Sequence, residues 1–351
     1  HTLPFSIMTF QDTPERNRIR SELYAKNTFT QKPLPIPPIP MQKPKRLRIG
    51  YFSSDFRVHS VIFLIADILD AHDRDRFEIY GYSFGPDDNS KIRNRIINSC
   101  DVFHDVREMG DKDIALLARK DKIDIAIDLN GYTLLSRPGI FAYRAAPIQI
   151  HFWGTANTSG SDFIDYYIAD DIGIPEEYER HWSESIIRLP HWGQAGYDTN
   201  YISDQLVTRE DFGLPENGFV FCNFSSSYRL SPIEFDIWMR LLNQVEDSVL
   251  WLLKSNKWVE ENLQQEARKR DVDADRLIFA EKVPHPVHLA RQKLADVFVD
   301  TFNVNAGVTA GDALWAGLPV VTKLGKGFAA RVGGSILSAI NIPELITKTE
   351  Q

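Results

Sequence analysis

"RLRIGYFSSDFRVHSVIFLIADILDAH" (residues 46–72) contains a strand, a short polar loop and a helix, in that order. Residues 46–53 place Ile, Tyr and Phe in a short run that is typical of a buried strand, and residues 61–72 form an apolar stretch of helical length. The same order recurs along the chain. This recurrence predicts a parallel sheet that helices cover on both faces.

Two series of such units follow one another. In the first, strands are expected at 77–84, 102–106, 123–129 and 147–154, with a helix at 111–120. The second has expected strands at 218–224, 248–254, 276–280, 296–300 and 319–323. Its helix at 231–245 has a complete start signal: Ser231 as N-cap, Pro232 at the first position and Glu234 closing a capping box. The fold class is therefore α/β, with two Rossmann-like domains facing across a cleft.

The expected domains are residues 46–205 and 206–351, preceded by a lead-in of residues 1–45. The lead-in contains a predicted helix at 13–27 and a Pro-rich stretch at 31–45, which we expect to be an extended, semi-rigid spacer. The chain starts at His1 and ends where a further helix is expected to begin. We therefore expect a piece of a longer protein, with its second domain truncated.

Composition excludes several classes of protein. The net charge of −8 argues against a nucleic-acid partner, and the longest apolar run, residues 61–69, is interrupted by Asp67 and is too short to cross a membrane. Cys100 and Cys222 provide neither a disulfide framework nor a metal site. No signal peptide is visible, so a reducing, cytoplasmic location is predicted. The P-loop lysine motif, G-x-G-x-x-G after a first strand and the G-x-S-x-G elbow are all missing.

Ligands of open parallel sheets bind beyond the carboxyl ends of the strands, and three loops are expected there. In the loop of residues 53–60, Asp55 and His59 are four residues apart, so a helical turn would place them on one face, where the carboxylate can raise the basicity of the imidazole. The alternative is that Asp55 caps the following helix and His59 lies on its surface. The loop of residues 223–232 offers the run of three serines at 225–227 and Arg229 to an anionic ligand, or forms a solvated turn.

The third loop is "NAGVTAGDALWAG" (residues 305–317). Its small residues allow close approach of a phosphate to a helix start, and Asp312 can accept hydrogen bonds from a ribose. The alternative is a tight turn in which Asp312, in the first helical turn, complements the helix dipole. Between these loops, His288 and Arg291 share a helix face near His285. No Cys or carboxylate lies at zinc spacing from the histidines, so they are either nucleotide contacts or surface residues.

With these loops, the chain resembles the catalytic region of the O-GlcNAc transferase and SPINDLY-like family. The similarity covers about residue 47 to the C-terminus, and the segments that carry it are "LRIGYFSSDFRVH", "DIAIDLNGYTLLSRPGIFAYRAAPIQIHFWGTANTSG", "DYYIAD", "VFCNFSSSYRLSP", "LADVFVDT", "AGVTAGDALWAGLPVVT" and "FAARVGGSIL". The resemblance implies the GT-B architecture, with the acceptor on the first domain and the nucleotide sugar on the second. It also implies tetratricopeptide repeats before the catalytic region in the full-length protein.

The family pattern implies roles for individual residues. His59 and Asp55 match residues proposed as catalytic, and Arg229 falls where most members carry a lysine on the diphosphate. Positions matched to substrate contacts are Arg137, Gly154, Ser226, His285, His288, Arg291, Gly307, Val308, Thr309 and Asp312. The animal-type pattern has Gln at 226, a His-Thr-Thr run at 307–309 and Lys at 285, so the identity of the donor is open.

The resemblance implies metal-independent transfer of a sugar, with inversion, to Ser or Thr hydroxyls of proteins. No cofactor is expected beyond the nucleotide-sugar donor. His59 is the expected base or orienting group, and Asp55 is its rival. UDP-GlcNAc is the expected donor; a GDP-sugar donor and a catalytically silent binding module are the alternatives.

Overall fold

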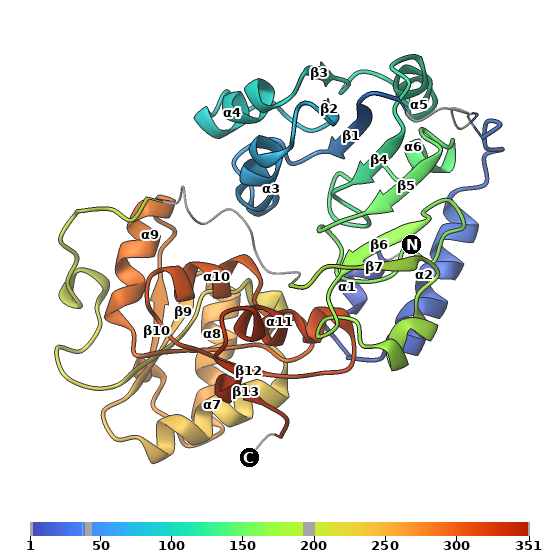
Figure 1. Ribbon diagram of the computed structural model, residues 1–351. Coiled ribbons are helices and arrows are strands. Elements are labelled where there is room, and N and C mark those ends of the chain that lie inside the picture. Colours follow the sequence, from blue (N-terminus) through green and yellow to red (C-terminus); the bar gives the residue numbers. More distant parts are fainter. Residues whose placement is uncertain (1–2, 37, 39–43, 192–200, 350–351) are drawn as a thin grey trace. The chain divides into compact units, whose positions relative to one another are not determined.

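The computed structural model describes residues 3–36, 38, 44–191 and 201–349, and the Pro-rich stretch predicted at 31–45 lies partly outside them. The chain forms two compact units (Figure 1). The first unit comprises residues 1–7 and 13–196, and the second comprises residues 8–12 and 197–351.

The first unit is built on a seven-stranded parallel sheet with the order β3-β2-β1-β4-β5-β6-β7. Its elements are α1 (Pro4–Ile7), α2 (Pro14–Thr28), β1 (Leu47–Ser53), α3 (Ser60–Ala71), β2 (Phe77–Ser83), α4 (Lys91–Ser99), β3 (Val102–Asp105), α5 (Asp111–Lys120), β4 (Ile125–Asp128), α6 (Gly139–Ala142), β5 (Ile148–His151), β6 (Tyr166–Ala169) and β7 (Ser185–Arg188).

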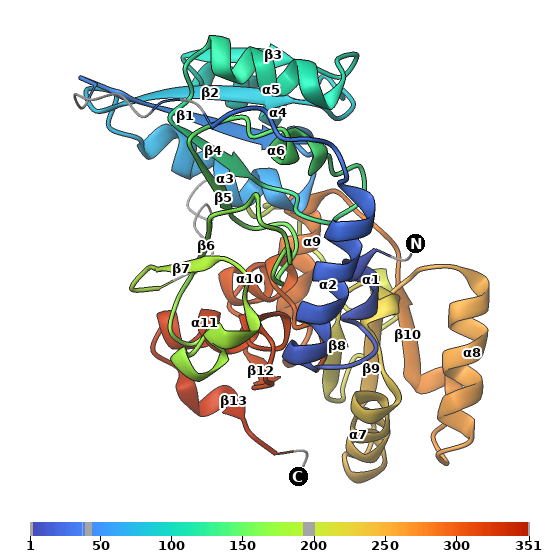
Figure 2. The same cartoon turned by 90° about the vertical axis from the view of Figure 1, so that its right-hand side faces the viewer.

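Helices cover both faces of this sheet. α3 packs beside α4, and α5 packs beside α6, on opposite sides of the strands (Figures 1 and 2). The strands are correspondingly apolar on both faces: the last five residues of β1 and of β2 are all buried. Phe52 and Tyr82 from these two strands stack with ring centroids 4.3 Å apart inside the core.

The second unit repeats the arrangement with six parallel strands in the order β10-β9-β8-β11-β12-β13. Its elements are β8 (Val220–Asn223), α7 (Pro232–Gln244), β9 (Val249–Leu253), α8 (Lys257–Arg268), β10 (Leu277–Ala280), α9 (His285–Arg291), β11 (Val297–Val299), α10 (Val308–Trp315), β12 (Val320–Lys323), α11 (Val332–Ala339) and β13 (Ile346–Thr347). The predicted start of α7 is confirmed, including the capping box of Ser231 and Glu234.

A short segment near the start of the chain belongs to the second unit. In residues 8–12, the carboxylate of Asp12 accepts hydrogen bonds from the backbone N–H groups of Lys326 and Gly327, and the carbonyl of Thr9 accepts one from the side chain of Asn303. The chain therefore begins in the first unit, contributes residues 8–12 to the second, builds the rest of the first and then returns to the second.

Strand order fixes where a ligand can bind in each unit. The chain winds outward from β1 in one direction through β2 and β3, and then in the other direction from β4, so β1 and β4 flank a topological switch point. β8 and β11 do the same in the second sheet. A ligand-binding site is therefore expected at the loops that follow these four strands.

Two local expectations need correction. Helix α10 begins at Val308, so Asp312 lies beyond its first turn and does not complement the dipole from the helix start as one interpretation required. The elements α4, β6, β7 and β13 were not predicted.

Gly154 offers a test of the packing under the β4 loop. Its φ is +59°, and a Cβ there would overlap the carbonyl oxygen of Asn130. Gly154→Ala should therefore lower the free energy of unfolding by about 3 kcal/mol, combining left-handed strain with overpacking. Gly213→Ala is the matched control, since Gly213 has φ +66° with open space beside it, and it should cost only about 1 kcal/mol. Equal losses in chemical denaturation would contradict this account.

Candidate functional site

The first switch point centres on the buried amide of Asn130, which follows β4. Its Nδ2 donates to Asp55 Oδ2 at 2.8 Å, and its Oδ1 accepts from the backbone N–H of Ser54 at 2.9 Å. The same Nδ2 lies 2.9 Å from the hydroxyl of Ser54 and 3.1 Å from that of Thr133. Asn130 thus joins the loop after β1 to the loop after β4, and it fixes the carboxylate of Asp55, which is only 3% exposed.

His59 meets Asp55 as predicted, but not by sharing a helix face. The loop turns back on itself, and His59 becomes the N-cap of α3, with extended backbone. Its Nδ1 lies 3.6 Å from Asp55 Oδ2 and accepts a hydrogen bond from the backbone N–H of Val61 at 3.3 Å. The helix cap is therefore His59 itself, and the alternative in which Asp55 caps the helix is wrong.

The surroundings of His59 favour a neutral imidazole. Burial lowers its pKa, the charge of Asp55 opposes that shift, and the charge of Arg57 adds to it. The Val61 N–H stabilises the tautomer with the proton on Nε2, whereas Asp55 would stabilise a proton on Nδ1. In either case Nε2 is the ring atom left for a substrate, as a donor in the first tautomer and as an acceptor in the second.

Arg137 and Gly154 serve the same loop in different ways. Arg137 Nε donates to Asp111 Oδ1 at 2.7 Å, and its Nη2 donates to the carbonyl of Met109, so this guanidinium anchors the far end of the β4 loop. Gly154 supports the loop from below, directly against the backbone of Asn130. Arg137 and Gly154 therefore both hold the loop that carries Asn130 in place.

The second switch point brings together the loops after β8 and β11. Arg229 Nη1 donates to the carbonyl of Asn305 at 3.0 Å, and the hydroxyls of Ser225 and Thr309 lie 3.4 Å apart. Ser226 is exposed beside them. The cation, the hydroxyls and the Gly307–Val308 start of α10 thus gather at one edge of the sheet, where a helix start and a fixed cation suit an anion.

Asp300 holds this second loop in shape. Its carboxylate accepts hydrogen bonds from the backbone N–H groups of Thr301 and Ala306 and from the hydroxyl of Thr322. Burial raises its pKa to about 7, and the nearby charge of Arg229 opposes this rise. The sequence placed Asp300 only as the end of a strand.

Asp312 and His285 form a pair on α10 and α9. His285 Nε2 lies 3.0 Å from Asp312 Oδ1, and the carboxylate is almost fully buried. The pair explains why a carboxylate is tolerated inside an otherwise small-residue helix.

Arg291 is buried rather than presented to solvent. Its side chain is 1% exposed and lies among the rings of Phe224, Trp251 and Phe212, at 5.0 to 5.7 Å, where burial lowers the pKa to about 10. Its Nε donates to His288 Nδ1 at 3.1 Å. Arg291 is therefore placed to orient His288, which is the member of the predicted pair closer to the surface.

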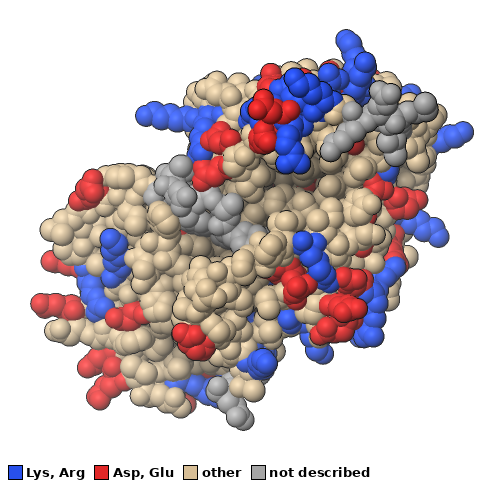
Figure 3. All heavy atoms as spheres, in the orientation of Figure 1, with Lys and Arg blue, Asp and Glu red and all other residues tan. Residues whose placement is uncertain are grey.

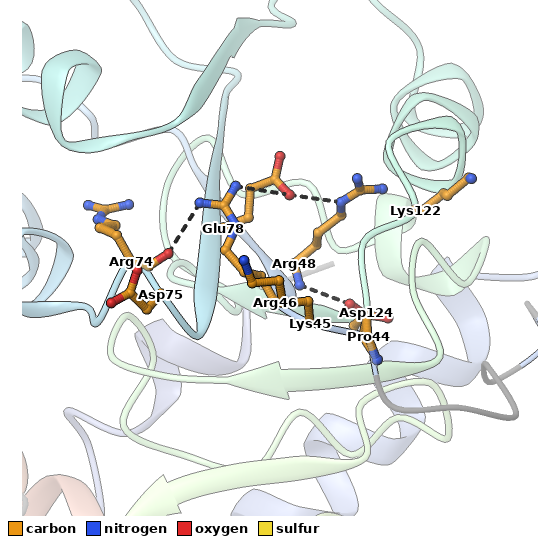
Figure 4. A pocket seen from close by; sticks show the side chains of 9 residues that line it. All are labelled: Pro44, Lys45, Arg46, Arg48, Arg74, Asp75, Glu78, Lys122 and Asp124. Carbon is orange, nitrogen blue, oxygen red and sulfur yellow. Dashed lines mark hydrogen bonds and ion pairs between the residues drawn. The ribbon is translucent and has the colours of Figure 1, made fainter.

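A cavity of about 570 Å³ lies at the end of the first sheet where the strands begin, opposite the end that carries Asn130 (Figure 4). It is lined by residues at or just before the starts of β1, β2 and β4. Within it, Arg48 bonds Glu78 through Nε and Asp124 through its backbone N–H. On the face of the first unit drawn in Figure 3, charges of both signs likewise lie side by side. Paired charges at the amino ends of the strands do not match the expected position of a ligand.

Within the described part of the chain, no group of three or more His, Cys, Asp or Glu side chains is placed to hold a metal ion. The helices described in the two units include none with the length and apolarity needed to cross a membrane.

The buried imidazole of His288 makes stability depend on pH. Burial, with the charges of Arg291 and His285, lowers its pKa to about 3. Below about pH 6.5, His288 is protonated in the unfolded chain but stays neutral in the folded chain. The contribution of His288 to the free energy of unfolding is therefore fully present above about pH 6.5 and decreases as the pH falls. In urea unfolding, the advantage of wild type over His288→Gln should shrink by about 1.4 kcal/mol per pH unit below 6.5. A difference that stays constant from pH 7.5 to 5 would contradict this.

The sequence of this chain is similar to sequences of known proteins. Residues 23–203 and 194–351 match the model of glycosyl transferase family 41. An Arabidopsis thaliana protein named "Probable UDP-N-acetylglucosamine--peptide N-acetylglucosaminyltransferase SEC" is 36% identical over 85% of this chain and 31% of its own length. A Caenorhabditis elegans UDP-N-acetylglucosamine--peptide N-acetylglucosaminyltransferase is 27% identical over 89% of this chain and 37% of its own length. The chain thus spans about a third of these relatives.

Among solved structures, a mutant O-GlcNAc transferase of Thermobaculum terrenum superposes with a TM-score of 0.87 at 27% identity. The match covers 96% of this chain and 64% of that one. It confirms the predicted two-domain GT-B fold class.

Proposed function

Because the chain belongs to glycosyl transferase family 41, we propose that it is the catalytic region of an enzyme that transfers N-acetylglucosamine from UDP-N-acetylglucosamine to Ser or Thr hydroxyls of proteins. The names of the Arabidopsis and Caenorhabditis relatives support this donor and this class of acceptor. The observation that carries the proposal is the cluster of Arg229, the Asn305 loop and Thr309 at the switch point of the second sheet.

In this proposal the second unit holds the donor. The diphosphate lies against Arg229 and the N-terminal end of α10, and Asp312 accepts hydrogen bonds from the ribose. As the bond between the anomeric carbon and the phosphate oxygen breaks, negative charge grows on the diphosphate. The cation and the helix start stabilise that charge without a metal ion.

The first unit handles the acceptor. The Ser or Thr oxygen attacks the anomeric carbon from the face opposite the leaving group, so configuration inverts, and its proton must pass to a base. His59 Nε2 accepts that proton when Nδ1 is protonated and faces Asp55. Asn130 keeps the carboxylate in position through this step.

Nucleotide binding tests the donor assignment. UDP at one hundred times its Kd should stabilise the protein by about 2.7 kcal/mol in thermal unfolding, and GDP should have no comparable effect. Stabilisation by GDP alone would instead support a GDP-sugar donor, and stabilisation by neither would support a binding module without transferase activity.

Substitution separates the two roles. His59→Ala should lower kcat by about 10²- to 10⁴-fold with little change in UDP affinity, whereas Asp312→Ala should weaken UDP binding. His104→Ala is a control, since His104 lies on the edge strand β3, away from both switch points, where it bonds Asp121 at the end of α5. Because burial lowers the pKa of His59, wild-type kcat/KM should fall only below about pH 6.5. Unchanged turnover in His59→Ala would remove His59 from the mechanism.

A further inference from the structure

We propose that a pocket beside the first switch point is a subsite for an apolar side chain of the protein acceptor, close in sequence to the modified Ser or Thr. This inference rests on the proposed function, since it assigns part of the acceptor to a defined place. The pocket has a volume of about 330 Å³ and lies within the first unit, between the end of α2 and the loop that follows β4.

Two walls of the pocket carry aromatic and apolar side chains. Tyr24 and Phe29 line one side, and both rings contact the buried ring of Tyr132. Leu134 and Leu135 line the other side, and they are 77% and 50% exposed. The two exposed leucines and the aromatic side chains opposite them form an apolar surface, and its burial by a ligand would be favourable.

The backbone of the loop is held in an unfavourable conformation at this point. Leu135 has φ +62°, in the left-handed region that Gly or Asn ordinarily occupies. The turn could be made without an exposed leucine, because a glycine there would relieve the strain. Strain that is kept at an exposed apolar residue points to a use for its side chain.

The pocket adjoins the loop that carries the candidate site. The side-chain nitrogen of Asn130 donates to Asp55 and also lies within hydrogen-bond distance of the hydroxyl of Thr133, which lines the pocket. One amide nitrogen therefore connects the proposed catalytic carboxylate to the rim of the pocket. The proposal places a residue next to the modified Ser or Thr at this loop when the acceptor hydroxyl lies at His59 and Asp55.

The charges in the pocket favour an uncharged guest. Arg137 and Asp111 are hydrogen-bonded to each other, and Arg137 also donates to the carbonyl of Met109. The two opposite charges in the pocket are therefore already paired. The volume lies at the small end of the range for ligand pockets, which suits one or two side chains rather than a nucleotide. The geometry thus selects an apolar residue of a polypeptide.

Paired acceptor peptides test the subsite. Each pair carries one Ser and differs only in having Leu or Asp at positions flanking it. Wild type should prefer the Leu peptide in kcat/KM by about tenfold, mainly through KM. Leu134→Ser and Leu135→Gly should bring this ratio close to one, and the glycine variant should fold at least as stably as wild type because its φ is positive. Leu116→Ser, at a 44% exposed leucine on α5 outside the pocket, should keep the preference.

The outcomes are distinguishable from those of the proposed function. Transfer to both peptides without preference, or a preference that survives both loop variants, would overturn the subsite and leave the transferase assignment intact. UDP binding without transfer to any peptide would overturn the transferase assignment and the subsite with it. A preference that is lost in the loop variants and kept in Leu116→Ser supports the subsite.

Discussion

A polar side chain buried at the end of a strand must have its hydrogen bonds satisfied, and in both units this constraint shapes the candidate site. Asn130 follows β4 and Asp300 follows β11, the strands that lie beside the first strand of each sheet. Each bonds backbone N–H groups of a loop, and each also bonds a hydroxyl, that of Thr133 for Asn130 and that of Thr322 on β12 for Asp300. The demand of one buried group therefore gives an otherwise irregular segment a single conformation.

The two groups meet this demand with opposite chemistry. The amide of Asn130 both donates and accepts, so it can hold a carboxylate and a backbone N–H at the same time. The ionised carboxylate of Asp300 only accepts, and N–H and O–H donors surround it. The first unit thereby keeps an acidic group ready near an imidazole, and the second keeps a cation and a helix start facing the same loop.

The fold was largely predictable because its signals are local. Apolar runs located the central strands, and the Ser231 to Glu234 spacing located the start of α7. The meeting of Asp55 and His59 was expected from their spacing, but the loop achieves it by bending into an N-cap. Asn130 and Asp300 were not singled out, because their importance depends on partners far away in sequence: Asn130 and Asp55 are 75 positions apart. The position of Asp312 was misjudged because Val308 and Thr309 already begin the helix.

Residues 8–12 have a consequence for how the protein can be divided. A gene cut after residue 196 would yield a downstream half without Asp12, leaving the amides of Lys326 and Gly327 without that acceptor, and without the Thr9 carbonyl that holds Asn303. The second unit is thus a discontinuous module in which a pentapeptide is encoded far upstream of the rest. Exchange of this half between homologous proteins requires that both segments be transferred together.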